Sequence, residues 1–369
     1  MIFYIIPFIF LAILTLIESK NKLNNTLKNK YFYYAIALFF IFFIGFRYEI
    51  GCDWEQYKGM FDKYNSMTFV EILKNNISSK QKLQEIGHIF LTSISQNIYI
   101  LNFIYSIIFS LPLFYFCFQL KRTYFSLLIS YPYYIIVVGM GPMRQAASVS
   151  LLMFSILLVK NKKYYRHFFI SIISSLIHQS SIFFNGIILG SSLSKIKEIK
   201  ASKKNIFIAI LISLIFLYCL PSIINKVTYY ITFYKYTDKY GARLIAPAKG
   251  SIYIWFINFV PSIIYLKNIS KFKFNNLLNK ILISFAITEF LLLPLVFFNS
   301  VIAYRLLLYL FPSSILITSY IPDLELLKIK KTHYLNFIIG ISLLSLIIWI
   351  KFAFHSSCWV PYKNILLMQ

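Results

Sequence analysis

The chain has 369 residues, of which 59% are hydrophobic and only 13% are charged. A soluble protein of this length would form two or three domains with about 25% charged residues, so the composition excludes that class and indicates a polytopic membrane protein. A net charge of +25 would favour nucleic-acid binding in a soluble chain. Here the aromatic residues lie within apolar runs, so we expect no nucleic-acid partner. We instead use the positions of the basic residues to assign each loop to one side of the membrane.

A helix that crosses a membrane needs ~20 predominantly apolar residues. The first such run begins at the initiator Met without a basic segment or a small-residue cleavage site, so we interpret it as a retained span. In chain order, the predicted spans lie near residues 2–17, 31–46, 98–118, 124–140, 143–159, 205–223, 251–266, 281–298, 301–321 and 335–354.

The apolar stretch 168–194 is too long for one span and is interrupted by the polar run His178-Gln179-Ser180-Ser181. The alternatives are one long tilted helix or two shorter helices that meet at His178. Positive charge decides between them, because 22 of the 37 Lys and Arg residues gather in six short loops. These loops share one side, cytoplasmic by the positive-inside rule, only if 168–194 crosses twice.

The sequence therefore predicts an all-α polytopic membrane protein with about 11–12 transmembrane helices in a single integral domain over residues 1–369. Both termini are expected outside. A long outer loop, 47–97, follows the second span and is expected to be partly helical. Two more outer segments are predicted, the loop 224–250 and the tail 355–369.

Arginines lie at the outer ends of spans, where a charge is costly: about 2.5–3.5 kcal/mol at a helix centre and less near an interface. One interpretation is that each arginine reaches toward lipid phosphates. The other is a shared anion site, because the planar guanidinium suits bidentate binding of phosphate. On that interpretation the residues predicted to bind a lipid-linked diphosphate are Arg47, Arg144, Arg305 and Arg243.

A group that deprotonates a sugar hydroxyl should be a carboxylate or a histidine beside an electropositive pocket. The predicted catalytic candidates are Asp53, Glu85 and His178, with His88 as a further possibility. The alternative for either acid is a simple ion pair with a nearby arginine. Glu49 and Asp53 are four residues apart and, on a helix, would share a face with Tyr57.

Other polar residues receive structural interpretations. No further acids cluster beside Asp53-x-Glu55, so we expect no metal site there. Glu289 is a solitary acid within a span, and we expect it to hydrogen-bond to a neighbouring helix. We expect three histidines to be surface residues: His167, His333 and His355.

The four cysteines have neither CxxC spacing nor a histidine at zinc-finger distance. The sequence therefore predicts no metal centre and no disulfide framework. Cys52 and Cys358 are expected to share a compartment, but a bond between them is not expected.

The pattern Phe46-Arg47-x-x-x-Gly51-x-Asp53-x-x-x-Tyr57 resembles the signature of EpsG-like and Wzy-type polysaccharide polymerases. Further segments resemble the family in the same order along nearly the whole chain: Glu85-x-Gly87-His88, Met143-Arg144-Gln145-x-Ala147, Ile177-His178-x-Ser180, Tyr304-Arg305 with Tyr309, and Pro361-Tyr362-Lys363-Asn364. The chain departs from the family pattern at His88, where an aromatic residue is usual, and at Cys52, where a small or Thr-like residue is commoner. The motifs supply the secondary candidates Tyr57, His88, Gln145 and Tyr304.

This resemblance implies a bacterial inner-membrane glycosyltransferase of the C-type polytopic fold. Such enzymes transfer a growing glycan from undecaprenyl diphosphate to the next lipid-linked repeat unit at the outer face. The implied partners are the donor and acceptor glycans on undecaprenyl diphosphate, the membrane and a chain-length regulator, with no cofactor. Two other functions stay open: a lipid-linked oligosaccharide flippase, and a membrane acyltransferase for which His167 is the plausible cytoplasmic histidine.

Overall fold

The computed structural model describes residues 1–20, 30–78, 85–196, 224–225, 228–229, 231–232, 248, 250–324 and 330–367. Over these residues the chain is helical, with one isolated β-bridge between Arg47 and Asn364. The predicted all-α polytopic fold is confirmed. Six of the described helices are long and apolar enough to cross a membrane: Ile2–Ser19, Ile98–Phe118, Met143–Lys160, Asn276–Phe298, Ser300–Asp323 and Lys331–Phe352.

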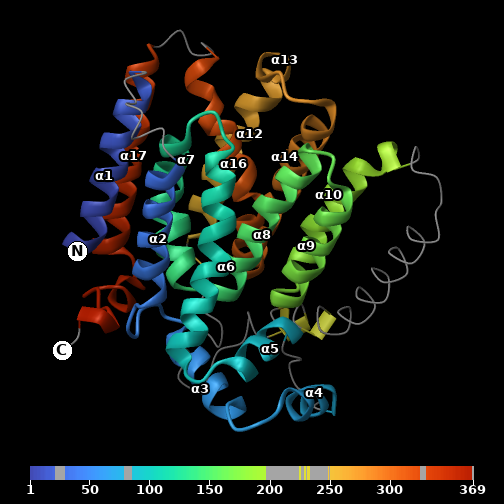
Figure 1. Ribbon diagram of the computed structural model, residues 1–369. Helices are drawn as coiled ribbons and strands as arrows, with labels where there is room; N and C mark the ends of the chain where they lie inside the picture. The colour runs from blue at the N-terminus through green and yellow to red at the C-terminus, as the bar shows by residue number, and fades with distance from the viewer. Residues whose placement is uncertain are drawn as a thin grey trace. The chain divides into compact units, whose positions relative to one another are not determined.

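Each span predicted outside 205–223 corresponds to a helix, and 205–223 lies outside the described residues. The first half contains α1 (Ile2–Ser19), α2 (Lys30–Gly45), α3 (Trp54–Tyr64), α4 (Phe69–Ser78), α5 (Ile86–Ile94), α6 (Ile98–Phe118), α7 (Thr123–Ser130), the π-helical η1 (Tyr131–Val138), α8 (Met143–Lys160), α9 (Tyr164–Ile177) and α10 (Ser181–Ile196). The second half contains α12 (Ser251–Lys267), α13 (Ile269–Phe272), α14 (Asn276–Phe298), α15 (Ser300–Leu307), η2 (Leu308–Leu310), α16 (Phe311–Tyr320), η3 (Ile321–Asp323), α17 (Lys331–Phe352), η4 (Ser356–Cys358) and η5 (Ile365–Leu367) (Figure 1).

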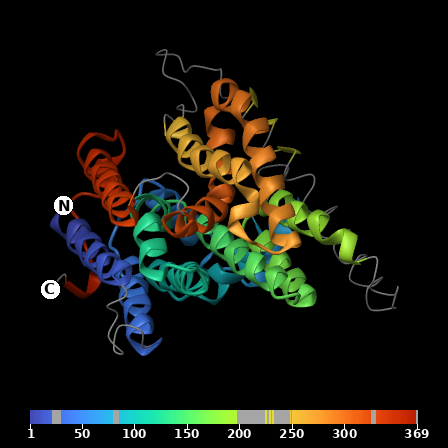
Figure 2. The same ribbon diagram turned by 90° about the horizontal axis from the view of Figure 1, so that it is seen from above.

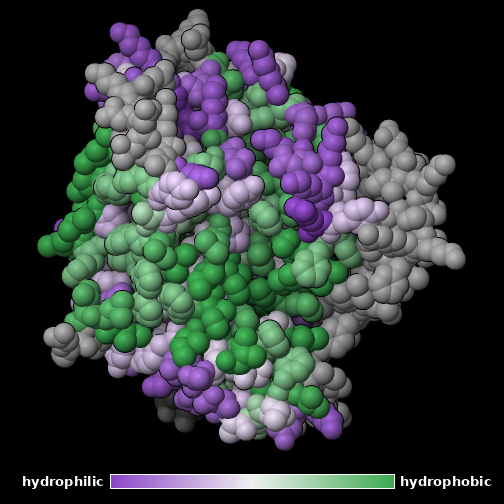
Figure 3. Space-filling view, viewed as in Figure 1, coloured by the Kyte–Doolittle hydropathy of each residue, from purple (hydrophilic) through white to green (hydrophobic). Residues whose placement is uncertain are grey.

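The helices expose large apolar side chains that water would not favour. Ile6 on α1 is 60% exposed, Leu291 on α14 is 73% exposed and Phe337 on α17 is 63% exposed. On the face drawn in Figure 3, hydrophobic side chains run along the helices, whereas hydrophilic ones gather near helix ends. This distribution fits helices whose outer surfaces contact lipid.

The chain forms two compact units. Unit 1 comprises residues 1–73, 86–154 and 318–369, and unit 2 comprises residues 74–85 and 155–317. The single integral domain expected from the sequence stays a prediction, and each unit is described by itself.

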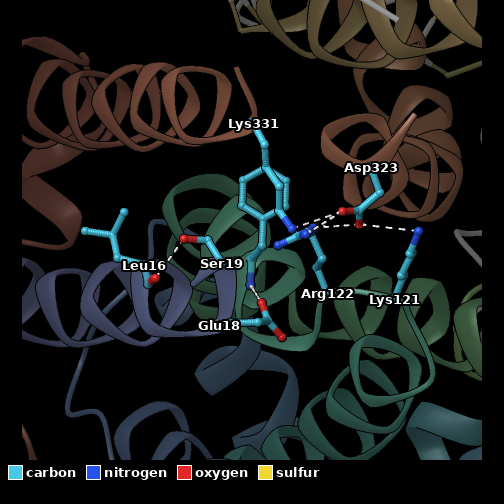
Figure 4. Close-up of polar contacts among 8 residues, drawn as sticks. Leu16, Glu18, Ser19, Lys121, Arg122, Asp323 and Lys331 are labelled. Carbon is cyan, nitrogen blue, oxygen red and sulfur yellow. Dashed lines mark hydrogen bonds and ion pairs between the residues drawn. The ribbon is translucent and has the colours of Figure 1, made fainter. Parts of the chain in front are cut away.

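One end of unit 1, the lysine end, is formed by residues 18–20, 119–124, 321–324 and 330–331. Arg122 donates two hydrogen bonds to the Asp323 carboxylate, at 2.8 and 2.5 Å, and Lys331 lies 3.2 Å from the same group (Figure 4). The Glu18 carboxylate accepts from the backbone N–H groups of Tyr124 and Phe125 at 3.4 and 3.2 Å. A carboxylate at this position satisfies the free N–H groups that begin α7.

The opposite end of unit 1, the tail end, is formed by residues 1–4, 46–53, 139–142 and 355–364. The Tyr4 hydroxyl donates to the Trp359 carbonyl at 2.6 Å, and the rings of Phe3 and Tyr362 lie 5.5 Å apart. Residues 1–4 and the tail residues 355–364 therefore lie at one end of this unit (Figure 1). Seen from above, α1 and α17 lie side by side (Figure 2).

The two ends of unit 1 test the predicted crossings. Because Asp323 contacts Arg122, residues 119–122 and 321–324 share one end, which requires an even number of crossings between them. Within the stretch 168–194, α9 ends at Ile177 and α10 begins at Ser181, so two helices occupy it, and their two crossings stay a prediction. Ser181 donates to Ser175 at 3.1 Å and Asn185 donates to the carbonyl of Ser171 at 3.4 Å, so the helices run antiparallel about His178. The two-helix interpretation is confirmed.

Two further predictions concern single elements. The loop 47–97 is partly helical as expected, since it contains α3, α4 and α5. Glu289 is 1% exposed and accepts a hydrogen bond from Ser262 of the neighbouring α12 at 2.7 Å, which confirms the expected contact between helices.

Candidate functional site

The motif loop, residues 46–53, connects α2 to α3 at the tail end of unit 1. Glu49 has φ 52° and Gly51 has φ 102°, so neither residue is helical. A Cβ atom at Gly51 would lie 2.2 Å from the Met140 carbonyl oxygen, which leaves room only for glycine. The helix that would give Glu49 and Tyr57 a common face is not formed, because α3 begins at Trp54, after Asp53.

Arg47 holds the end of α2 and the start of the motif loop. Its side chain is 2% exposed, and it donates to the carbonyls of Ile44 at 2.8 Å and Ile50 at 3.2 Å. The last carbonyls of a helix lack partners within the helix, and arginine commonly satisfies them. Burial lowers the pKa of Arg47 to about 10, against the opposing effect of Tyr57 and other tyrosines, so the guanidinium is charged at neutral pH.

Asp53 occupies the N-cap position of α3, but its side chain makes no capping hydrogen bond. The carboxylate is half-buried and, among the described residues, has no ion-pair partner. The alternative of a simple ion pair with an arginine thus finds no support in the described part of the chain. An uncommitted carboxylate at a partly open position is able to accept a proton from a substrate hydroxyl.

Tyr57 lies one helical turn after Asp53, and Arg144 packs against it. The guanidinium carbon of Arg144 is 5.3 Å from the centre of the Tyr57 ring, within cation–π range. Burial raises the pKa of the Tyr57 hydroxyl, and the charge of Arg144 partly offsets that effect. Tyr57 is 5% exposed, whereas Arg144 is half-buried, so Arg144 is partly accessible beside a buried aromatic ring.

Arg144 is the second residue of α8, and its backbone position adds to the positive field. The N-terminus of a helix carries partial positive charge and free N–H groups, which favour anions. Gln145 follows it and is 2% exposed. Together Arg144 and the start of α8 are suited to hold a phosphate group.

His88 on α5 completes this side of the site. Its Nδ1 atom lies 3.0 Å from the Tyr105 hydroxyl on α6, and its ring meets the Tyr57 ring edge-on at 6.1 Å. His88 is 3% exposed and Tyr105 is 1% exposed. The His88 ring therefore packs between the side chains of Tyr57 and Tyr105. Tyr105 is a residue of this group that the sequence motifs did not single out.

A second group of predicted residues lies in unit 2, around the break between α9 and α10. The His178 Nδ1 atom lies 2.9 Å from the Tyr309 hydroxyl, and the Tyr309 ring stacks on Phe184 at 4.9 Å. Tyr304 and Arg305 lie on α15, about one turn before Tyr309, and both are half-buried.

The remaining candidates are Glu85 and Arg243. Glu85 directly precedes α5, is 2% exposed and groups with unit 2 by its contacts. Arg243 lies outside the described residues. Unit 1 therefore brings together Arg47, Asp53, Tyr57, His88, Arg144 and Gln145, and unit 2 contains Glu85, His178, Tyr304 and Arg305.

Two predictions about single residues are wrong. Cys52 and Cys358 form a disulfide, although 306 residues separate them. They lie close because the motif loop and the tail pair side by side. His167 is fully buried, and its Nδ1 atom lies 2.5 Å from the Ser155 hydroxyl of α8. His333 and His355 are exposed, as expected.

Within the described ranges, no group of three His, Cys, Asp or Glu side chains is placed to hold a metal ion. The chemistry available to the unit 1 group is anion binding by Arg144 and proton acceptance by Asp53.

A family model described as the EpsG family matches residues 30–364. The matched range includes the motif loop, α8 and the tail through Asn364. No curated protein and no solved structure shows significant similarity to the chain.

Proposed function

The chain belongs to the EpsG family of membrane proteins, which are similar to Wzy-type polysaccharide polymerases, and from this premise we propose that it joins lipid-linked oligosaccharide repeat units. In this proposal donor and acceptor are both carried on undecaprenyl diphosphate in a bacterial inner membrane. The observation that carries it is the cluster at the tail end of unit 1, where Arg144 lies over Tyr57, one turn from the uncommitted carboxylate of Asp53.

The proposed reaction is a direct displacement. The Asp53 carboxylate takes the proton of an acceptor hydroxyl, and the hydroxyl oxygen attacks the anomeric carbon of the donor. The bond from that carbon to the diphosphate oxygen breaks, and its electron pair leaves with undecaprenyl diphosphate. Arg144 stabilises the negative charge that develops there. A single displacement inverts the anomeric centre without a covalent intermediate.

The other predicted residues take supporting roles in the proposal. Arg47 is buried and bonded to the carbonyls of Ile44 and Ile50, which favours positioning of the motif loop over direct contact with diphosphate. Arg305 and Arg243 stay predicted contacts for diphosphate. Glu85 and His178 stay alternative bases.

The outer location of the site is also part of the proposal. Disulfides persist in oxidising compartments and are rare in the cytosol, and the Cys52–Cys358 bond adjoins Asp53. The lysine end, which carries Lys20, Lys121 and Lys331, lies at the other end of unit 1 and matches the cytoplasmic charge bias. These two observations support a tail end that faces away from the cytosol.

Two alternative functions make different demands. A flippase should place its charged residues along a cavity that opens to both sides, whereas the unit 1 cluster gathers at one end. A membrane acyltransferase would need a histidine accessible to its acyl donor. His167, the histidine considered for that role, is fully buried against Ser155.

Deletion of the gene distinguishes the three functions. If the protein is a polymerase, the deletion strain should carry a surface glycan of single repeat units. If it is a flippase, the strain should carry no surface glycan. If it is an acyltransferase, the strain should carry full-length chains without an acyl group. The deletion strain also supplies the substrate, because lipid-linked repeat units should accumulate in it. Purified protein given these lipids alone should form polymer and release undecaprenyl diphosphate; no polymer from folded protein would overturn the proposal.

A further inference from the structure

The C-terminal tail pairs with the motif loop through backbone hydrogen bonds near both ends of the loop. Tyr48 donates to the carbonyl of Lys363 at 3.0 Å, and Gly51 donates to the carbonyl of Cys358 at 2.9 Å. Arg47 and Asn364 form an antiparallel bridge. Residues 358–364, here the strap, therefore run along the whole motif loop.

Aromatic side chains anchor the strap to helices of unit 1. Trp359 is 5% exposed, and its indole N–H donates to the Ile136 carbonyl at 3.0 Å, within the π-helical η1. The Tyr362 hydroxyl donates to the Phe43 carbonyl at 2.8 Å, and its ring stacks on Phe43 at 4.6 Å. These contacts fix the strap to the end of α2 and to the segment that leads into α8.

The disulfide links the strap to the residue next to Asp53. Cys52 is exposed and Cys358 is half-buried, so a small reductant can reach the bond. His355 also lies here, with its Nδ1 atom 3.6 Å from the Cys52 sulfur. The Asp53 side chain makes no capping hydrogen bond of its own. Asp53 directly follows Cys52, so the backbone position of Asp53 depends on the motif loop, which the strap holds.

We propose that Cys52 and Cys358 are positioning residues for the reaction, and that their bond and the strap hold the backbone of Asp53 where its carboxylate reaches the acceptor hydroxyl. This inference rests on the proposed function. Arg144 begins α8 and its guanidinium packs on the Tyr57 ring of α3, and neither residue lies in the motif loop or the strap, so the bond should affect catalysis more than binding of the donor diphosphate. The bond also makes the activity dependent on oxidation.

The test measures kcat and KM for the lipid-linked donor on purified protein, per folded molecule. Cys52→Ser, Cys358→Ser and the double variant should each lower kcat by about 10- to 100-fold, since a shift of about 1 Å in a catalytic group has effects of that size. KM should change by less than about threefold, because the phosphate contact persists. Cys117→Ala is the matched control, since Cys117 is the free, buried cysteine of the described chain.

Reduction of the folded wild-type protein provides a second measurement in case the variants fail to fold. Dithiothreitol converts the bond to two thiols and is itself oxidised to a cyclic disulfide, and kcat should fall as in the variants and recover on reoxidation. Maleimide labelling on non-reducing gels follows the bond independently of activity. Unchanged kcat after complete reduction would overturn the positioning role. An intact bond in a wild-type protein that makes no polymer would overturn the proposed function itself.

Discussion

The guanidinium carbon of Arg144 lies 5.3 Å from the centre of the Tyr57 ring, so a cation at the start of α8 rests on an aromatic side chain of α3. An arginine at a helix end often reaches toward lipid phosphates without a fixed partner. Here the ring restricts the guanidinium before any ligand arrives. A restrained cation loses less conformational entropy when it binds a phosphate, which favours a specific anion site.

Replacement of Arg144 tests the proposed phosphate contact. Arg144→Ala should lower kcat/KM for polymer formation by about 10²–10³-fold, the usual effect of removing a group that stabilises a developing anion. Arg144→Lys should recover part of the activity, because it keeps the charge but loses bidentate geometry. The measurement is polymer formed from purified lipid-linked repeat units.

Arg166→Ala is the matched control for Arg144. This arginine is exposed in the first turn of α9, so the change removes an equal charge without touching the site. Activity of Arg144→Ala within twofold of the control would exclude a role for Arg144 in diphosphate binding.

The aromatic support makes a second prediction. Tyr57→Leu should raise KM for the donor by about tenfold, since a desolvated cation–π contact contributes about 1–2 kcal/mol. Tyr57→Phe keeps the ring and should raise KM by less than about threefold. Tyr64→Leu, at the end of the same helix, controls for loss of an aromatic residue from α3. Equal effects of Leu and Phe at position 57 would show that the hydroxyl, not the ring, is what matters.

The fold was largely predictable from the sequence because hydropathy and positive charge report on the membrane directly. The polar run at His178 correctly predicted a break, since membrane-depth backbone without helical hydrogen bonds needs polar partners. The Tyr309 hydroxyl, 131 residues along the chain, supplies one. Such a pairing depends on how helices pack, which no local pattern records.

The unit 1 site was less predictable, because its conformation depends on contacts between distant segments. The motif loop is not helical, since Gly51 approaches the Met140 carbonyl and the tail supplies its hydrogen bonds. Cys52 and Cys358 gave no spacing signal, and their shared predicted side was the one available indication. His167 was expected to be solvated because basic residues surround it in the sequence, but it is fully buried and bonds to Ser155 on the preceding helix.

Asp53 makes the third prediction. Asp53→Asn should lower kcat by about 10²–10⁴-fold, the range typical of a general base, and leave KM for the donor nearly unchanged. Asp62→Asn is the matched control, because Asp62 is exposed on the same helix and the change in charge is identical. Wild-type kcat in Asp53→Asn would show that Asp53 is not the base and would leave Glu85 or His178 in that role. The variants Glu85→Gln and His178→Asn should therefore be measured in parallel.

The lysine end makes the last prediction, on stability. Asp323 contacts three cations that differ in burial: the side chain of Arg122 is 6% exposed, whereas those of Lys331 and Lys121 are 34% and 50% exposed. Removing one partner of a buried pair costs up to about 3–5 kcal/mol when the other charge is left without compensation. Lys331 and Lys121 still offset part of the Asp323 charge in Arg122→Ala, so the cost should lie below that range but above that of an exposed pair. Exposed pairs contribute about 0–1 kcal/mol. Arg122→Ala should therefore lower the thermal unfolding temperature of the purified protein well below that of Lys331→Ala. Both variants should keep wild-type kcat per folded molecule, since these residues lie at the end of unit 1 opposite Asp53 and Arg144. Equal unfolding temperatures for the two variants would mean that the Arg122–Asp323 contact is solvated in the membrane protein and contributes no more than a surface pair.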